Sequence, residues 1–301
     1  MMTTRVIAVV GPTAAGKSAL AIALAHALDG EVINCDSMQL YRGMDIGTAK
    51  LSADERDGVP HHLLDIWPVT RTATVAEFQA LARAAIDEVA ARGKLPLLVG
   101  GSGLYHRAVL EDFEFPGTDP GVRAALEAEL AEHGPLALHA RLTTLDPLAA
   151  EQILASNGRR LVRALEVIQI TGKPFTAALP DPRPVYDTLQ LAVDRTDLDA
   201  RVETRVRDMW DRGLVDEVRS LLPLGLAEGI TASRALGYQQ VLAFLDGTCT
   251  EEEAFASTVT GTRRFVRRQR SWFRRDPSVI WTDGAADDLV PAVLSLIGER
   301  A

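Results

Sequence analysis

The stretch Gly11-Pro12-Thr13-Ala14-Ala15-Gly16-Lys17-Ser18 decides the fold of this chain. It follows the apolar run 6–10 and precedes residues 19–28, which are rich in helix formers and contain no glycine or proline. This order predicts a buried strand, a tight glycine loop and a helix, the context that the pattern G-x-x-x-x-G-K-S requires. Because backbone N–H groups and the helix N-terminus face an anion in such a loop, we predict that all eight residues bind a diphosphate or triphosphate. Lys17 adds a positive charge, and the Ser18 hydroxyl is the predicted protein ligand of Mg²⁺.

The composition is that of an ordinary globular protein. The 301 residues are 47% hydrophobic, and the formal net charge is −9. Cys35 and Cys249 form no C-x-x-C motif, which favours a reducing compartment and argues against a disulfide framework or a zinc module. No apolar run approaches the roughly 18 residues that a membrane helix needs. We therefore expect a cytoplasmic monomer with no membrane partner.

Two further predicted strands end in polar residues. Residues 31–35 are followed by Asp36-Ser37 and a polar loop to residue 50, and residues 95–99 are followed by Gly100-Gly101-Ser102. Ligands of an open parallel sheet gather at the carboxyl ends of its strands, so Asp36, Ser102 and the glycine loop should face one crevice. Asp36 is the only strand-end carboxylate found there, whereas Ser102 has the alternative role of capping the following helix.

The middle of the chain has a different pattern of predicted secondary structure. Residues 115–120, Phe-Pro-Gly-Thr-Asp-Pro, mark a boundary, and helical patterns without a convincing strand follow to about residue 171. Four prolines between residues 173 and 184 are typical of a stiff linker. The prediction is an α/β fold, a P-loop NTPase-like parallel sheet flanked by helices, with an inserted all-helical domain. The core comprises residues 1–116 and 187–301, with a strand at 189–193 and helices at 198–212, 214–222, 231–245 and 251–275, and the insert comprises residues 117–186.

Two clusters of polar residues allow more than one interpretation. His61 and His62 are adjacent, but neighbouring side chains diverge and no third ligand has metal-site spacing, so a structural role is predicted. Seven arginines lie between residues 263 and 275 of the last long predicted helix. They are predicted to form a phosphate-facing strip, and the alternative is a solvated helix face that pairs with carboxylates of the same chain.

Several motifs in these elements are similar to those of the bacterial tRNA dimethylallyltransferases, and the resemblance covers nearly the whole chain. The glycine loop alone is shared with many NTPases, whereas its combination with the block from Asp36 to Lys50 is specific. The matching segments are the glycine loop, Asp36-Ser-Met-Gln-Leu-Tyr-Arg-Gly-Met-Asp-Ile-Gly-Thr-Ala-Lys50, Pro60-His61-His62, Gly100-Gly-Ser-Gly-Leu-Tyr105, Arg163-Ala-Leu-Glu-Val167 and Arg268-Gln269 before Trp272-Phe273-Arg274.

The resemblance implies transfer of a dimethylallyl group from dimethylallyl diphosphate to N6 of adenosine 37, beside the tRNA anticodon, with release of pyrophosphate. It implies Mg²⁺ as cofactor and the tRNA anticodon arm as partner. Lys17, the loop amides and the metal would stabilise the departing pyrophosphate. Asp36 would accept the N6 proton, and Ser102 completes the predicted catalytic residues. Because the target base is normally stacked, the enzyme would have to flip it out.

The resemblance also implies which residues contact tRNA. Ser102 stands where threonine is usual, Leu51 where proline is common, and Gln239 where the family often has a basic residue, which puts one charge-assisted contact in question. The implied contacts are Asp36, Ser37, Met38, Gln39, Ser102, Arg123, Arg159, Arg160, Leu161, Val162, Arg163, Arg234, Gly237, Tyr238 and Gln239.

Two other functions are compatible with parts of the sequence. The glycine loop also suits a small-molecule or nucleoside kinase that uses ATP. The basic strip and the loop together also suit a nucleotide-gated RNA-binding protein without chemistry. Preference for dimethylallyl diphosphate over ATP, and analysis of the product after incubation with tRNA, separate these hypotheses.

Overall fold

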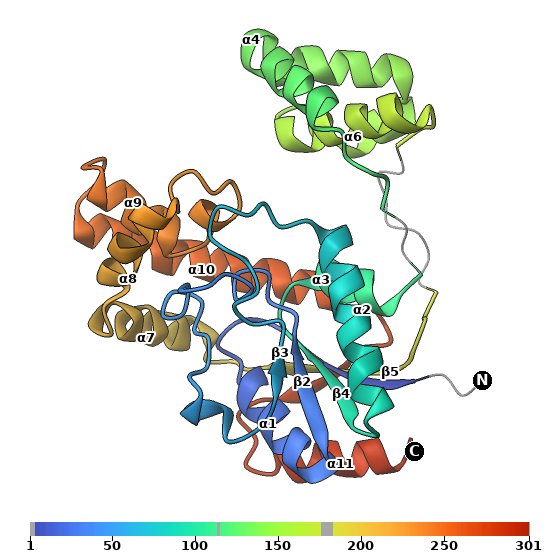
Figure 1. The fold of residues 1–301 in the computed structure, drawn as a ribbon, viewed down its shortest axis with the longest axis vertical. Coiled ribbons are helices and arrows are strands. Elements are labelled where there is room, and N and C mark those ends of the chain that lie inside the picture. The colour runs from blue at the N-terminus through green and yellow to red at the C-terminus, as the bar shows by residue number, and fades with distance from the viewer. Residues whose placement is uncertain (1–3, 113–114, 176–182, 301) are drawn as a thin grey trace. The chain divides into compact units, whose positions relative to one another are not determined.

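The computed structural model describes residues 4–112, 115–175 and 183–300 of the chain (Figure 1). The chain divides into two compact units, one formed by Met1–Asp112 with Pro184–Ala301 and the other by Phe113–Arg183. The second unit corresponds to the insert predicted at 117–186, and each of its two boundaries lies a few residues earlier than predicted. Part of the predicted proline linker lies outside the described residues.

A parallel sheet forms the centre of the first unit. In the described residues it has six strands in the order β3-β2-β4-β1-β5-β6, and each neighbouring pair is parallel. Strand β1, in the interior of the sheet, is buried on both faces, which is typical of a parallel sheet covered by helices. The strands are β1 (Arg5–Val10), β2 (Gly30–Asn34), β3 (His61–His62), β4 (Leu95–Val99), β5 (Asp187–Asp194) and β6 (Ile280–Asp283).

Helices cover both faces of this sheet. Because side chains alternate along a strand, Val6, Ala8 and Val10 of β1 join one hydrophobic core, while Ile7 and Val9 join another. The first core includes side chains of α2 (Val75–Ala91), α3 (Gly103–Leu110), α8 (Leu214–Leu221) and α9 (Tyr238–Leu245). The second includes side chains of α1 (Lys17–Leu28), α7 (Leu198–Asp211) and α11 (Leu289–Gly298), and α10 (Glu251–Phe273) contributes to both.

The predicted α/β fold is confirmed, but the prediction of one helix over residues 231–245 is wrong. A short 3-10 turn, η3 (Ala232–Arg234), is followed by Ala235 in an extended conformation and by Gly237 at φ 87°, and only then does α9 begin. A positive φ cannot continue an α-helix, so Gly237 separates the two segments. Strand β6 and helix α11 were not predicted. Two other 3-10 turns are η1 (Asp54–Arg56) and η2 (Leu222–Leu224).

The second unit is helical in all of its described secondary structure, and it has its own core. Helices α4 (Pro120–Leu145), α5 (Pro147–Gln152) and α6 (Gly158–Thr171) enclose a cluster that includes Leu126, Leu142 and Leu165. Helix α4 is kinked at Gly134, where φ is 76°, immediately before Pro135. Among the described helices of the whole chain, none has the length and apolar character to cross a membrane.

A buried carboxylate crosslinks this helical unit. The Glu166 side chain has no exposed surface, and its Oε2 accepts hydrogen bonds from Arg123 at 2.5 Å and from Arg163 at 2.8 Å. Burial opposes ionisation of Glu166, but the hydrogen bonds from the two arginines outweigh it and lower the pKa of the carboxyl. The pair with Arg123 therefore ties α4 to α6, and the pair with Arg163 lies within α6.

We predict that Glu166→Gln lowers the free energy of unfolding by about 1–3 kcal/mol, because two charge-assisted hydrogen bonds lose their acceptor charge. A lowered folded-state pKa means that this contribution is present above the ordinary value of 4.5 and is lost as the pH falls through the folded-state pKa. Thermal unfolding from neutral pH to about pH 3 measures it, with the exposed Glu132→Gln as control. A difference between Glu166→Gln and wild type that did not shrink in acid would contradict the ionic origin.

Candidate active site

The glycine loop connects β1 to α1, as predicted. Gly11 has φ 119°, and a Cβ at this position would lie 2.4 Å from the carbonyl oxygen of Val193 on β5. Only glycine therefore lets the loop leave the sheet along this path. Gly16 also has a positive φ, 106°, immediately before α1 begins. The two glycines thus shape the turn that joins the strand to the N-terminus of α1, where an anion can bind.

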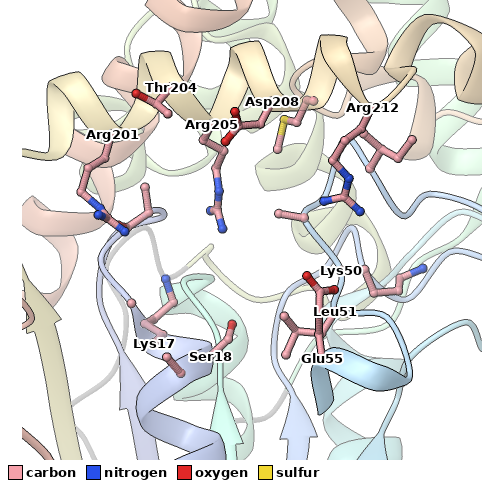
Figure 2. Close-up of a pocket in the computed structure, with 16 residues that line it drawn as sticks. Lys17, Ser18, Lys50, Leu51, Glu55, Arg201, Thr204, Arg205, Asp208 and Arg212 are labelled. Carbon is pink, nitrogen blue, oxygen red and sulfur yellow. The ribbon is translucent and has the colours of Figure 1, made fainter. Parts of the chain in front are cut away.

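Two arginines of α7 hold the loop from the opposite side. The Nε of Arg201 donates to the carbonyl oxygen of Ala14 at 2.9 Å, and a guanidinium NH2 group of Arg205 donates to the Thr13 hydroxyl at 2.9 Å. Figure 2 shows both side chains pointing from α7 toward Lys17 and Ser18. Together these residues line a cavity of about 610 Å³. We name this the donor cavity, after the diphosphate donor that the sequence predicts for the glycine loop.

The donor cavity is electropositive where it meets the loop. Lys17 donates to the carbonyl oxygen of Pro12 at 2.7 Å. Burial and the nearby charge of Arg205 lower the pKa of Lys17 to about 8, and the negative charge of Asp36 only partly opposes them. Burial also lowers the pKa of Arg205, with a further contribution from Arg201. An anion bound between these cations would stabilise their charged forms.

A second cavity of about 280 Å³ adjoins the end of β2, and we name it the acceptor cavity. Arg205 and Met209 line both cavities. A smaller cavity of about 70 Å³ contains Lys17, Asp36 and Arg205 among its lining residues. The predicted tRNA contacts that line the acceptor cavity are Asp36, Ser37, Met38, Ser102 and Arg234, and Thr13 of the glycine loop lines it as well.

Asp36 is held by its own strand end. The Asn34 side chain accepts from the Asp36 backbone N–H at 3.0 Å and donates to the Asp36 carbonyl oxygen at 3.1 Å. Burial raises the pKa of the Asp36 carboxyl, against the hydrogen bond from the Met38 backbone and the charges of Lys17 and Arg205. Ser102 precedes α3 but its side chain makes no capping hydrogen bond in the described structure. The alternative role of Ser102 as a helix cap is therefore not observed.

The loop from Asp36 to Lys50 is fixed by the contacts of two charged side chains, Glu217 and Lys50. Glu217 of α8 accepts the backbone N–H groups of Asp45, Ile46 and Gly47 at 3.1, 2.7 and 3.2 Å. It also accepts the Tyr238 hydroxyl at 2.5 Å. Lys50, whose side chain is 2% exposed, binds the carboxylates of Asp45 and Asp65. These charges hold the loop in place beside both cavities.

Some of the predicted tRNA contacts are corrected by their burial. Tyr238 is fully buried with its hydroxyl on Glu217, and Leu161 and Val162 belong to the core of the helical unit. Their side chains are therefore not available to RNA. Gln39 donates to the carbonyl oxygen of Thr48 at 3.1 Å and so braces the loop. Gly237 is buried and Gln239 is exposed.

Arginines in two segments have structural partners. Arg123 and Arg163 bind Glu166, and Arg163 also donates to the carbonyl oxygens of Pro116 and Gly117. Arg159 and Arg160 are exposed on α6. In α10, Arg263 binds Glu203 and Arg270 binds Asp194, and Arg274 at the end of the helix also lies 3.6 Å from the Asp194 carboxylate. At these three positions the alternative, pairing with carboxylates of the same chain, is observed instead of the predicted phosphate-facing strip. Arg268 is exposed, packs over the Phe265 ring and lines the acceptor cavity.

The adjacent histidines have structural contacts, as predicted. His62 binds the Glu31 carboxylate at 2.6 Å, and the Nδ1 of His61 is 2.8 Å from the carbonyl oxygen of Val59. Within the described ranges, no group of three or more His, Cys, Asp or Glu side chains is placed to hold a metal ion. A metal ion at the histidine pair would therefore need ligands other than these side chains.

Sequence reasoning missed Arg201 and Arg205. Their i, i+4 spacing puts both on one face of α7, and this signal is visible in the sequence. Nothing in the sequence, however, indicates that this face of α7 lies over the glycine loop. Gln269 was noted as part of a motif, but its contacts were not predicted.

Comparison with known proteins identifies the family of the chain. The sequence model described as IPP transferase matches residues 39–276. The chain belongs to the IPP transferase family. Two relatives named tRNA dimethylallyltransferase come from Salinispora arenicola and Streptomyces avermitilis. The first is 69% identical over 298 residues, covering 98% of this chain and 87% of the relative, and the second is 66% identical over 300 residues, covering 98% and 96%.

Solved structures of family members share the fold. The full-length tRNA isopentenylpyrophosphate transferase of Bacillus halodurans has a TM-score of 0.73 and 40% identity, with 98% of this chain and 96% of that chain covered. A eukaryotic dimethylallyltransferase, described as acting on tRNA, has a TM-score of 0.83 and 26% identity, with 99% and 79% covered. The similarity therefore includes both units of the chain.

The lowered pKa of Lys17 gives a pH prediction. In the free protein Lys17 loses its proton as the pH rises through about 8, so the affinity for inorganic pyrophosphate should fall above that pH, by up to about tenfold per pH unit. Calorimetric titration of wild type and Lys17→Met measures this, and the ratio of the two affinities removes the titration of pyrophosphate itself. A ratio that is independent of pH would show that Lys17 does not bind the anion.

Proposed function

We propose that this chain transfers a dimethylallyl group from dimethylallyl diphosphate to N6 of adenosine 37, beside the anticodon of tRNA, and releases pyrophosphate. The observation that carries the proposal is Arg205, which lines both the donor cavity at the glycine loop and the acceptor cavity at Asp36. The family and the names of the relatives support the same activity.

The donor cavity suits an allylic diphosphate. Lys17 and Arg205 are charged groups at the glycine loop, where the diphosphate would bind, and Ile46, Leu51 and Met209 provide apolar surface in the same cavity. Preorganised cations in a buried site stabilise negative charge that develops as the leaving group departs. The site thus combines contacts for the two halves of the donor.

Ser18 is the residue that would hold Mg²⁺. It lines the donor cavity next to Lys17 at the start of α1. Because Mg²⁺ usually keeps water and phosphate oxygens among its six ligands, one protein hydroxyl fits such a site. When bound, the ion supplies further charge stabilisation for the diphosphate.

The acceptor cavity suits an extruded adenine. N6 would attack the allylic carbon while the bond from that carbon to the diphosphate oxygen breaks and its electron pair leaves with pyrophosphate. The N6 proton passes to the Asp36 carboxylate, whose pKa is raised by burial, so it is a stronger base than an exposed aspartate. Phe265 offers an aromatic surface against which an unstacked base can pack.

We propose that the active form is a monomer. A tRNA substrate supports a cytoplasmic location. We include both in the proposal.

Asp36→Asn tests the function and the role of the carboxylate together. Single-turnover transfer should fall about 10²–10⁴-fold because the amide cannot accept the proton, while donor affinity and its magnesium dependence stay near those of wild type. Mass analysis of nucleosides from tRNA incubated with the donor measures transfer. The exposed Asp287→Asn is the matched control. Absence of modified adenosine with wild type would refute the function, and rescue of Asp36→Asn by added magnesium would assign Asp36 to the metal instead.

Arg234 and Arg268 are exposed arginines that line the acceptor cavity. Changing each to alanine should weaken tRNA binding and reduce the salt slope by about 0.7–0.9 per lost phosphate contact. Titrations at several salt concentrations measure the slope, with Arg219→Ala, an exposed arginine paired with Asp216, as control. Slopes equal to that of wild type would remove these two residues from the RNA interface.

A further inference from the structure

A buried amide on α10 connects the glycine loop to the loop that carries Ser102. Gln269 is 5% exposed. Its Oε1 accepts the backbone N–H of Thr13 at 2.9 Å, and its Nε2 donates to the carbonyl oxygen of Gly101 at 3.0 Å. Thr13 lies in the glycine loop, and Gly101 directly precedes Ser102. One side chain therefore joins the proposed donor side of the site to its acceptor side.

The two partners fix the orientation of this amide. The Thr13 N–H can only donate, and the Gly101 carbonyl oxygen can only accept, so one assignment of the amide oxygen and nitrogen satisfies both. A Cβ on Gly101 would lie 2.1 Å from the Gln269 Nε2, so the glycine is needed for this approach. The side chain thus fills the space between the two loops.

The helix that carries Gln269 is itself anchored. Val266 and Phe273 on α10 are buried in the two hydrophobic cores on opposite faces of the sheet. Between them, Arg270 donates to both carboxylate oxygens of Asp194 at 2.8 and 3.0 Å. Helix α10 therefore provides a fixed point against which both loops are held.

The contact also reaches the residue that lines both cavities. Thr13 uses its N–H for Gln269 and its hydroxyl for Arg205. Because Pro12 has no N–H and that of Thr13 is bound to Gln269, neither of these two residues offers an amide to a phosphate. Gln269 thus sets the position of Thr13, and Thr13 in turn holds Arg205.

We propose that Gln269 is a positioning residue that keeps the glycine loop and the Ser102 loop in register, so that the donor carbon and the acceptor nitrogen meet at reacting distance. This inference rests on the proposed function. Misplacement of reacting groups by about 1 Å costs on the order of 10²-fold in rate. Donor binding requires only the glycine loop, so the donor affinity depends less than the transfer rate on the relative position of the two loops.

Gln269→Glu and Gln269→Met test the proposal. Ionised glutamate offers two acceptors and faces the Gly101 carbonyl oxygen with a negative charge, whereas protonated glutamate offers one donor and one acceptor, as glutamine does. Burial raises the pKa of such a carboxyl, so the transfer rate of Gln269→Glu relative to wild type should rise about tenfold between about pH 8 and pH 6. Gln269→Met has neither group, and its relative rate should stay low and constant.

Single-turnover rates at saturating dimethylallyl diphosphate give these ratios. Lys17, Asp36, Arg205 and His106 are present in all three proteins, so their own titrations cancel. We expect the two variants to transfer about 10²-fold more slowly than wild type near pH 8, with donor affinity changed only a few-fold. A flat ratio for Gln269→Glu, or a wild-type rate for Gln269→Met, would overturn the inference.

The proposed function and this inference can fail separately. If wild type transfers no dimethylallyl group, the function is refuted, and the contact is then judged by amide hydrogen exchange at Thr13. That amide should exchange slowly in wild type and at least tenfold faster in Gln269→Met. Equal exchange in the two proteins would also reject the role of Gln269.

Discussion

The structure depends on positive charge that is buried at the glycine loop. Burial lowers the pKa of both Lys17 and Arg205; the charge of Arg205 lowers that of Lys17 further, and the charge of Arg201 lowers that of Arg205. Asp36 offers only partial compensation, because burial raises its own pKa. Such an arrangement is unfavourable for folding and becomes favourable when an anion binds, so the surrounding sheet and helices must hold the cations together.

Other charged groups provide that support at a distance from the reacting atoms. Glu217 binds the backbone of the loop between Asp36 and Lys50 and the Tyr238 hydroxyl. Lys50 binds Asp45 and Asp65, and Arg270 binds Asp194 at the end of β5. In the helical unit, Glu166 engages Arg123 and Arg163. The charged side chains named above are bound to partners within the chain. Those that are exposed or line a cavity are the ones available to substrates.

The sequence predicted the glycine loop, the strand ends at Asp36 and Ser102, and the helical insert, because each of these depends on residues close together in the chain. Arg205 and Gln269 were beyond reach, since their roles arise when α7 and α10 pack against a loop roughly 190 and 250 residues earlier. Spacing showed which arginines of α10 share a face but not that Arg263 and Arg270 have carboxylate partners. The resemblance implied a tRNA contact for Tyr238, and it could not show that α8 packs nearby, so that the tyrosine is buried with its hydroxyl on Glu217.

A glycine loop of this kind serves kinases as well, so the central claim is that the loop here holds a leaving group rather than a phosphoryl donor. The most direct measurement is the amount of inorganic pyrophosphate released for each adenosine modified in tRNA, with ATP offered in a parallel reaction. We expect one pyrophosphate for each modified adenosine, and with ATP no phosphate transfer to RNA or to a small-molecule acceptor. Phosphate transfer from ATP, or pyrophosphate release without modification of tRNA, would contradict it.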